Sequence, residues 1–313
     1  MDKALVDEII ASQPDGRMLF DYFPDRYAVW VLSRLIGDEK RIAEIRKIPL
    51  AVRLLERPLI KELLALSGDG VLRREMLDMA WAEPARQFLL DFTTWSDDGD
   101  RIWNQMSRKG SNLVVQLNFS NAHEEQYQRL VKPSSDYLFK FSCHPVKMRG
   151  GQDRFRETLA WARIDLDFEA DEALIEEIQS DWVREAQDML DQLEKESWGA
   201  DDLEMYGAYG SIDNVRRYLT EVLEPYRQLW EEAMMSAAIK VIVEELGIRT
   251  IFYHSYETGA AIKMCNPPRR LYTKLPRKFG FEKTETWPSF LKPKVYRKAL
   301  RKVDEPHWFR LVL

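Results

Sequence analysis

Residues 158–182 read TLAWARIDLDFEADEALIEEIQSDW, and their pattern is the clearest indication of the fold class. Thr158–Phe168 and Ala173–Gln179 are two short segments rich in apolar and β-branched residues, separated by the acidic residues around Asp171. Such a pattern is typical of consecutive β-strands. From Asp181 onward the apolar residues recur at helical spacing instead. The stretch therefore predicts a strand pair that leads directly into a helix.

The preceding residues extend this strand pattern. Leu113–Phe119 (LVVQLNF) alternates in the way a strand does, and Asn121–Val131 reads as a helix with Ser120 or Asn121 as its N-cap. Tyr137–Cys143 is a further strand candidate. We therefore expect an antiparallel meander formed by Tyr137–Cys143, Thr158–Phe168 and Ala173–Gln179.

The residues after Asp181 predict helices and then more strands. Breaks at Gly207–Gly210 and at Pro225 divide the helical stretch, whose last part, Tyr226–Leu246, ends at the helix-terminating Gly247. The remaining expected elements are a strand at Arg249–His254, a helix at Arg269–Lys278, and strands at Phe281–Trp287 and His307–Leu313.

The first hundred residues have a different pattern. Their apolar residues recur at helical spacing as far as about residue 85, with turn signals such as Pro14-Asp15-Gly16 between the helices, and Phe88–Trp95 is a possible strand. The acidic stretch 96–100 reads as a linker. We expect a helical N-terminal domain over residues 1–100 and an α+β domain over residues 101–313, with a helical insertion at about 183–225.

Composition limits the class of protein. The chain has 313 residues, of which 45% are hydrophobic and 31% are charged, which is typical of a globular protein. Its longest apolar run, Tyr27–Leu32, is far shorter than the ~20 residues of a membrane span, and the acidic start does not resemble a signal peptide. Cys143 and Cys265 form no CxxC pair, so reduced thiols are expected. These features predict a cytoplasmic protein with no membrane partner.

Charge is distributed unevenly along the chain. Residues 165–204 contain 16 acidic and 2 basic side chains, a balance of −14, whereas residues 263–302 contain 13 basic and 2 acidic ones, a balance of +11. The basic block also contains aromatic residues such as Tyr272 and Trp287, a combination that suits nucleic acid or a phosphate-rich cofactor. Pairing of the two blocks within one molecule would account for the same distribution.

The order of the expected elements over residues 110–313 resembles that of the GNAT-type N-acetyltransferases. Leu271–Leu275 followed by Phe279–Glu282 is similar to the LYxKxGF ending of that family, although Pro276–Lys278 intervene. The resemblance implies an α+β fold with a GNAT-like mixed, mostly antiparallel sheet flanked by helices. It also implies transfer of an acyl group from acetyl-CoA or another acyl-CoA to an amine of a small molecule, peptide or protein. Tyr272 would then protonate the leaving thiolate.

A second resemblance lies in the segment EEIQSDW at residues 176–182. It is similar to a signature of domains in large polyvalent proteins of phages and mobile elements, and Leu159–Arg163, Thr258-Gly259 and Tyr272–Pro276 match further motifs of those domains. This chain departs from the pattern at Trp161 and at Val183-Arg184, where the family has histidine and His-Gln. The EEIQSDW strand, Thr258-Gly259 and the segment that begins at Tyr272 are separate in sequence but resemble the same domain. Separate segments most readily share such a pattern when they form one site, so we expect the EEIQSDW strand and Tyr272 to face one cleft.

Two carboxylates in this strand are candidate general bases. Side chains alternate along an extended chain, so Glu177 and Gln179 share one face and Glu176 lies on the other. A carboxylate on a covered strand is costly unless it is paired, which makes Glu177 or Glu176 a candidate base with a raised pKa, or else an ion-pair partner of Arg163. The further cleft residues that we expect are Arg163, Gln179, Asp181, His254 and Thr258.

The residues expected to contact the cofactor differ from those of the N-acetyltransferases. The R/Q-x-x-G-x-G/A turn with which that family binds pyrophosphate is absent after Trp182, and Gly207, Gly210 and Ser211 form the nearest glycine turn before a helix. An ordinary loop between helices is the alternative. The basic residues expected to hold the phosphates are Lys263, Arg269, Arg270 and Lys274. Metal-ligand spacings such as HxxxH do not occur, so we expect no metal.

A non-catalytic function is the alternative to acyl transfer. On this interpretation the chain is an accessory protein of a phage or mobile element. It would bind nucleic acid or a host protein through the basic, aromatic residues 263–302.

Overall fold

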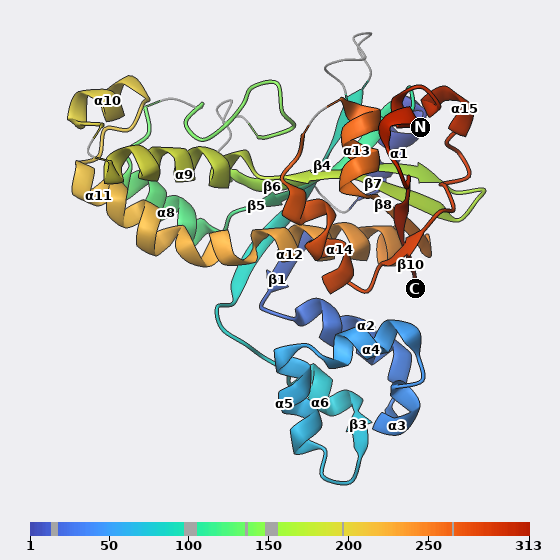
Figure 1. The fold of residues 1–313 in the computed structure, drawn as a ribbon. Helices are drawn as coiled ribbons and strands as arrows, with labels where there is room; N and C mark the ends of the chain where they lie inside the picture. Colours follow the sequence, from blue (N-terminus) through green and yellow to red (C-terminus); the bar gives the residue numbers. More distant parts are fainter. Residues whose placement is uncertain (14–17, 97–104, 135–136, 148–155, 196, 265) are drawn as a thin grey trace.

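The computed structural model describes residues 1–13, 18–96, 105–134, 137–147, 156–195, 197–264 and 266–313. Its centre is an eight-stranded sheet (Figure 1) with the strand order β1-β4-β5-β6-β7-β8-β10-β9. Only β7 and β8 pair in parallel, and all other neighbours are antiparallel. The strands are β1 (Met18–Tyr22), β4 (Arg86–Ser96), β5 (Ser111–Asn118), β6 (Thr158–Asp167), β7 (Glu172–Gln179), β8 (Thr250–His254), β9 (Glu282–Thr284) and β10 (Trp308–Val312).

The predicted fold class is confirmed, because the chain forms an α+β protein with a mixed, mostly antiparallel sheet flanked by helices. All residues of β5 and nearly all of β6 are buried, as expected for central strands covered on two faces. In Figure 1, α12 (Glu224–Lys240) runs below the sheet and α13 (Tyr256–Lys263) lies above it. The long apolar helix α12 contacts five strands from β1 to β7 and forms much of the core.

A second group of helices extends away from the sheet. These helices lie at one end of the molecule in Figure 1 and include the expected helical insertion. The first residue of α9 (Asp181–Glu194) comes two positions after the end of β7. The serine at residue 180 caps α9, because its hydroxyl accepts a hydrogen bond from the Val183 amide. The group comprises α8 (Asn121–Leu130), α9 (Asp181–Glu194), α10 (Ala200–Met205) and α11 (Ile212–Arg217).

The N-terminal hundred residues do not form a purely helical domain. Strands β1 and β4 come from this region and pair with each other, and β4 pairs with β5 at one side of the main sheet. Only the middle of the region forms a separate lobe in Figure 1, and the expected linker lies almost wholly outside the described residues. The lobe contains α2 (Arg26–Ile36), β2 (Glu39–Arg41), α3 (Ile42–Ile45), α4 (Pro49–Leu55), α5 (Pro58–Leu66), β3 (Val71–Arg73) and α6 (Arg74–Asp78), while α1 (Lys3–Ser12) contacts β4 and β5.

The strand predicted at Tyr137–Cys143 is wrong. These residues form turns, with Phe139 in the left-handed region at φ 60°. Their apolar character has another cause: Leu138 and Phe139 are buried, and Phe139 packs on Trp182 of α9 with ring centroids 5.2 Å apart. The segment therefore closes over the aromatic cluster between α8 and α9, and it carries His144 toward the sheet.

The C-terminal elements are shorter than expected. The predicted helix at Arg269–Lys278 is a 3-10 turn, Arg269–Tyr272, followed by the short α14 (Lys274–Lys278), and β9 covers only three residues of the predicted Phe281–Trp287. After β9, α15 (Pro293–Tyr296) and a second 3-10 turn, Ala299–Lys302, lead into β10. Among the helices formed by the described residues, none has the length and apolar character needed to cross a membrane.

Candidate functional site

The parallel strands β7 and β8 separate at a β-bulge. Arg163 of β6 lies opposite Glu177, but the next residue, Ile164, lies opposite Ile175, so Glu176 is an extra residue in β7. The pairing of β7 with β8 runs only from Glu172 to Ile175. Within the described residues, the last three residues of β7, 177–179, therefore have a strand partner on the β6 side alone.

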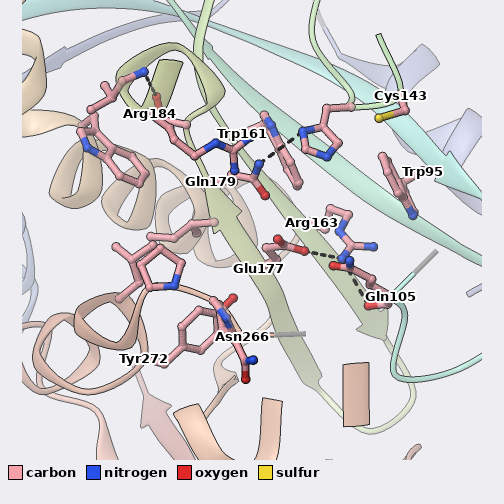
Figure 2. Close-up of a pocket in the computed structure, with 18 of the residues that line it drawn as sticks. Trp95, Gln105, Cys143, Trp161, Arg163, Glu177, Gln179, Arg184, Asn266 and Tyr272 are labelled. Carbon is pink, nitrogen blue, oxygen red and sulfur yellow. Dashed lines mark hydrogen bonds and ion pairs between the residues drawn. The ribbon is translucent and has the colours of Figure 1, made fainter. Parts of the chain in front are cut away.

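A cavity of about 740 Å³ opens at the end of β7, beyond this separation. Figure 2 shows Glu177 between Tyr272 and Asn266 on one side and Arg163 and Gln105 on the other. The expected common cleft of the EEIQSDW strand and Tyr272 is thus confirmed. Residues that line the cavity include Trp95, His144, Trp161, Arg163, Glu177, Gln179, Arg184, Trp230, Asn266 and Tyr272.

Glu177 is an ion-pair partner rather than a base with a raised pKa. Its carboxylate accepts a hydrogen bond from the buried guanidinium of Arg163, which stands opposite it in the register. Burial acts to raise the pKa of Glu177, but the charges of Arg163 and Lys263 outweigh it and hold the pKa below its usual value. The carboxylate therefore stays ionised at neutral pH, and the alternative that the sequence left open is the correct one.

Glu176 points away from the cavity into a closed polar cluster. Its carboxylate accepts hydrogen bonds from the Ser107 hydroxyl (2.8 Å) and from His254 Nε2 (3.1 Å), and Lys263 Nζ lies 3.5 Å away. The Lys263 ammonium also donates to the Glu176 carbonyl. All four side chains are buried and none lines the cavity, so the predicted site roles of Glu176, Lys263 and His254 are not supported.

This cluster has fixed protonation states. Burial raises the cost of an ionised Glu176, but Lys263 and the hydrogen bond from His254 more than offset it and lower the pKa of Glu176. Burial also lowers the pKa of His254 to about 4, despite the neighbouring carboxylate. At neutral pH the cluster therefore holds an anionic Glu176, a cationic Lys263 and a neutral His254.

The stability of the protein should consequently fall in mild acid. Between pH 6.5 and 4 the unfolded chain protonates His254 while the folded chain does not, so the free energy of unfolding decreases as the pH falls through this range. We expect His254→Gln to remove up to about 3 kcal/mol of the decrease between pH 7 and pH 4.5. Urea unfolding at the two pH values tests this, with His307→Gln, at a partly exposed histidine, as the control. An unchanged pH dependence in His254→Gln would contradict it.

His144 and Asp181 form a pair beside the cavity that the sequence did not reveal. His144 Nδ1 lies 2.8 Å from Asp181 Oδ2, and because a carboxylate only accepts, Nδ1 carries the proton. The Asp181 carboxylate is buried and accepts further hydrogen bonds from Gln179, Trp161 and Arg184. In the neutral imidazole, Nε2 is then the unprotonated, basic nitrogen. The pair has the arrangement of a general base with an orienting carboxylate.

Aromatic side chains form the walls of the cavity. Trp95 and Trp161 stack with ring centroids 6.2 Å apart and an interplanar angle of 12°. The Arg163 guanidinium lies over the Trp95 ring at 4.9 Å, and this cation–π contact helps to hold Arg163 in position for its ion pair with Glu177. On the opposite wall, Tyr272 stacks on Tyr253 at 5.0 Å. The cavity thus combines large apolar faces with a few oriented polar groups, as ligand sites do.

The glycine turn predicted to bind phosphate has a structural role. The Gly210 amide donates to the Val131 carbonyl, Ala208 forms a β-bridge with Pro133, and the Ser211 hydroxyl caps α11. Gly207 and Gly210 thus hold α10 and α11 against the end of α8, and neither they nor Ser211 line the cavity. Glycine is needed at residue 210 because a Cβ there would lie 2.0 Å from the Leu130 carbonyl oxygen.

We therefore expect Gly210→Ala to destabilise the protein without acting on ligand binding. The added methyl group would force two backbone segments apart, at a cost of about 1–3 kcal/mol. Gly68→Ala is the matched control, because a Cβ at Gly68 meets nothing within 4 Å. Chemical denaturation of both variants measures the difference, and equal stabilities would show that the close approach at Gly210 is relieved at no cost.

The other predicted cofactor residues also lie outside the cavity lining. Arg269 pairs with Glu257 at 3.0 Å, Arg270 pairs with Glu231 at 3.1 Å, and Lys274 is exposed at the start of α14. Thr258, predicted as a cleft residue, is buried and donates its hydroxyl proton to the His307 carbonyl. Of the basic side chains that we expected near the cleft, only Arg163 lines the cavity, and the sequence analysis missed Arg184.

The polar groups of the site are thus positioned by the end of β7, the start of α9 and the loops that carry His144 and Tyr272. No family model, curated protein or solved structure matches this chain. The geometry of the cavity is consequently the basis for any assignment of function.

Proposed function

We propose that the cavity is the active site of an acyltransferase that moves an acyl group from coenzyme A to an amine. The observation that carries this proposal is the position of the cavity. It lies where two parallel strands separate, with the His144–Asp181 pair on one side and Tyr272 on the other. Proton removal from an amine and proton donation to a thiolate are the two transfers that the reaction requires.

The free edge of β7 suits the acyl donor. An extended ligand with amide groups can pair with an unpartnered strand edge through main-chain hydrogen bonds, and the pantetheine arm of an acyl-CoA has this character. Such an arm lying along Glu177–Gln179 would bring its thioester to the cavity wall that carries Tyr272. The likeness of the element order and of the LYTKL segment to N-acetyltransferases supports the same donor.

The polar groups of the cavity suit a cationic acceptor. Glu177 is held ionised by Arg163, so its carboxylate favours a ligand with an ammonium group over a neutral or anionic one. The faces of Trp95 and Trp161 can cover an apolar or aromatic body attached to that group. An amine with an apolar substituent is therefore the acceptor that the lining favours.

The proton transfers follow from these positions. His144 Nε2 takes a proton from the acceptor ammonium, and Asp181 stabilises the imidazolium through its hydrogen bond to Nδ1. The free amine then attacks the thioester carbonyl, which forms the amide bond and breaks the carbon–sulfur bond. The Tyr272 hydroxyl gives its proton to the departing thiolate, and the second proton that the acceptor nitrogen loses as the amide forms restores the Tyr272 hydroxyl. Each proton transfer of this kind is worth about 10²- to 10⁴-fold in rate.

The phosphates of the coenzyme A would be contacted by a residue other than those predicted from the sequence. The first turn of α9 contains Asp181, whose charge disfavours an anion at the amides of this helix end. The predicted Arg269 and Arg270 are paired elsewhere, and Lys274 does not line the cavity. Arg184, one turn into α9, also pairs with Asp181 (3.1 Å) and Glu185 (3.4 Å), but unlike Arg269 and Arg270 it lines the cavity, where its side chain is half-exposed. We assign to Arg184 the contact that the glycine turn makes in the N-acetyltransferases.

Binding of acetyl-CoA is the first test of the proposal. We expect calorimetry to detect acetyl-CoA or a longer acyl-CoA, and Arg184→Gln to weaken binding about tenfold, as for a lost charge-assisted hydrogen bond. Arg217→Gln, which removes an exposed arginine at the far end of α11, is the matched control. Absence of binding at millimolar acyl-CoA would contradict the proposal. If DNA still binds in a salt-sensitive way, the non-catalytic alternative takes its place.

A further inference from the structure

The basic block divides into two parts in the structure. Several cations in its first part are neutralised within the molecule: Lys263 by Glu176, Arg269 by Glu257, Arg270 by Glu231, Lys278 by Glu232 and Lys283 by Glu305. Residues 292–302 (KPKVYRKALRK) contain six basic residues and no acidic one. Among the described residues, no acidic side chain forms an ion pair with Lys292, Lys294, Arg297, Lys298 or Arg301.

These five side chains are exposed on a firmly packed segment. The segment consists of α15 and the 3-10 turn Ala299–Lys302, and it contacts α13. Leu291 and Leu300 are buried on its inner side, and Tyr296 stacks on Trp287 at 6.0 Å. The positive charges are therefore held in place before any partner binds, which reduces the entropy cost of association.

The acidic block cannot neutralise this segment. In Figure 1, α10 lies at one end of the molecule and α15 at the other. Exposed charges further apart than about 8 Å are largely screened at physiological salt, so the net charge of −6 does not cancel the local field. The intramolecular pairing that the sequence left open thus accounts for part of the basic block but not for residues 292–302.

We propose that residues 292–302 bind the phosphate backbone of nucleic acid. Closely spaced, exposed arginine and lysine side chains are the groups that neutralise successive phosphates, and Tyr296 and Val295 at the surface offer contacts to sugars or bases. A membrane fits less well, because interfacial segments expose a broad apolar face, whereas Leu291 and Leu300 point into the core. The segment carries no base-reading motif, so the binding is independent of sequence.

Nucleic acid at this segment and an acyl-CoA in the cavity would use different residues, because no residue of 292–302 lines the cavity. Each property can therefore be present without the other. The two proposals are tested by separate variants.

The test compares two variants of equal net charge. The test variant, Lys294→Gln/Lys298→Gln/Arg301→Gln, removes three cations of the segment. The control variant, Lys47→Gln/Lys61→Gln/Arg217→Gln, removes three exposed cations outside the segment, each of which forms an ion pair with a nearby glutamate. Binding of fluorescent 20-nucleotide double-stranded DNA, single-stranded DNA and RNA is measured by anisotropy over a range of salt. Vesicles that contain anionic lipid form a separate arm, and circular dichroism checks that each variant is folded.

We expect the wild type to bind at least one of the nucleic acids, with an affinity that falls steeply with salt. The first variant should bind at least tenfold more weakly, and its slope of log K against log[salt] should be shallower by about 2 to 3, since each phosphate contact contributes about 0.9. The second variant should keep the wild-type slope. No binding at 50 mM salt, equal slopes in the two variants, or binding to anionic vesicles alone would each overturn the proposal.

Discussion

His144→Gln should lower kcat/KM for acyl transfer by about 10²- to 10⁴-fold while acyl-CoA binding changes little. Glutamine keeps a polar side chain of similar size that can still donate to Asp181, but it cannot take a proton from the acceptor amine. Asp181→Asn should have a comparable effect, because the orienting carboxylate and its charge are both lost. Release of free thiol from acetyl-CoA in the presence of an amine measures the rate.

The control for this prediction is a buried histidine that does not line the cavity, His123. His123 lies in α8 and is buried, and its Nε2 lies 3.0 Å from the hydroxyl of Tyr218, which follows directly on α11. His123→Gln should therefore affect stability more than turnover. A rate in His144→Gln within threefold of the wild type would show that another group removes the proton.

The largest expected effect on stability is that of Lys263→Met. This change leaves the buried Glu176 carboxylate without its cationic partner, and breaking a buried ion pair from one side costs about 3–5 kcal/mol. The double variant Lys263→Met/Glu176→Gln removes both charges and should recover part of that loss. Chemical denaturation of the single and double variants gives both values.

The exposed pair Lys61–Glu56 supplies the matched control, because Lys61→Met should change the free energy of unfolding by less than about 1 kcal/mol. If Lys263→Met is as stable as Lys61→Met, the cluster around Glu176 contributes little to the fold. A double variant less stable than Lys263→Met would mean that Glu176 has partners more important than Lys263.

Much of the sheet could be predicted from local patterns. The runs at Leu113–Phe119, Thr158–Phe168 and Ala173–Gln179 became β5, β6 and β7, because strands buried on two faces have a strong apolar signal. The pattern at Tyr137–Cys143 failed, because Leu138 and Phe139 are buried against helices rather than in the sheet. The spacing and composition of apolar residues indicate that a segment is buried, but they do not show whether a strand or a helix packs against it.

The predicted site was right where it depended on one strand and wrong where it depended on tertiary contacts. Alternation placed Glu177 and Gln179 on the cavity side and Glu176 on the other, as the structure has them. The pairing of His144 with Asp181 joins residues 37 positions apart through an irregular loop, and no spacing rule signals such a contact. The ionised state of Glu177 depends on the register that places Arg163 opposite it.

The most direct test of the acyltransferase proposal is a crystal structure of the full chain with a hydrolysis-resistant acyl-CoA analogue. We predict that the pantetheine arm lies along Glu177–Gln179, that the thioester position is within hydrogen-bond distance of the Tyr272 hydroxyl, and that Arg184 contacts a phosphate. An analogue bound elsewhere, or an empty cavity at a saturating concentration of analogue, would contradict the proposal.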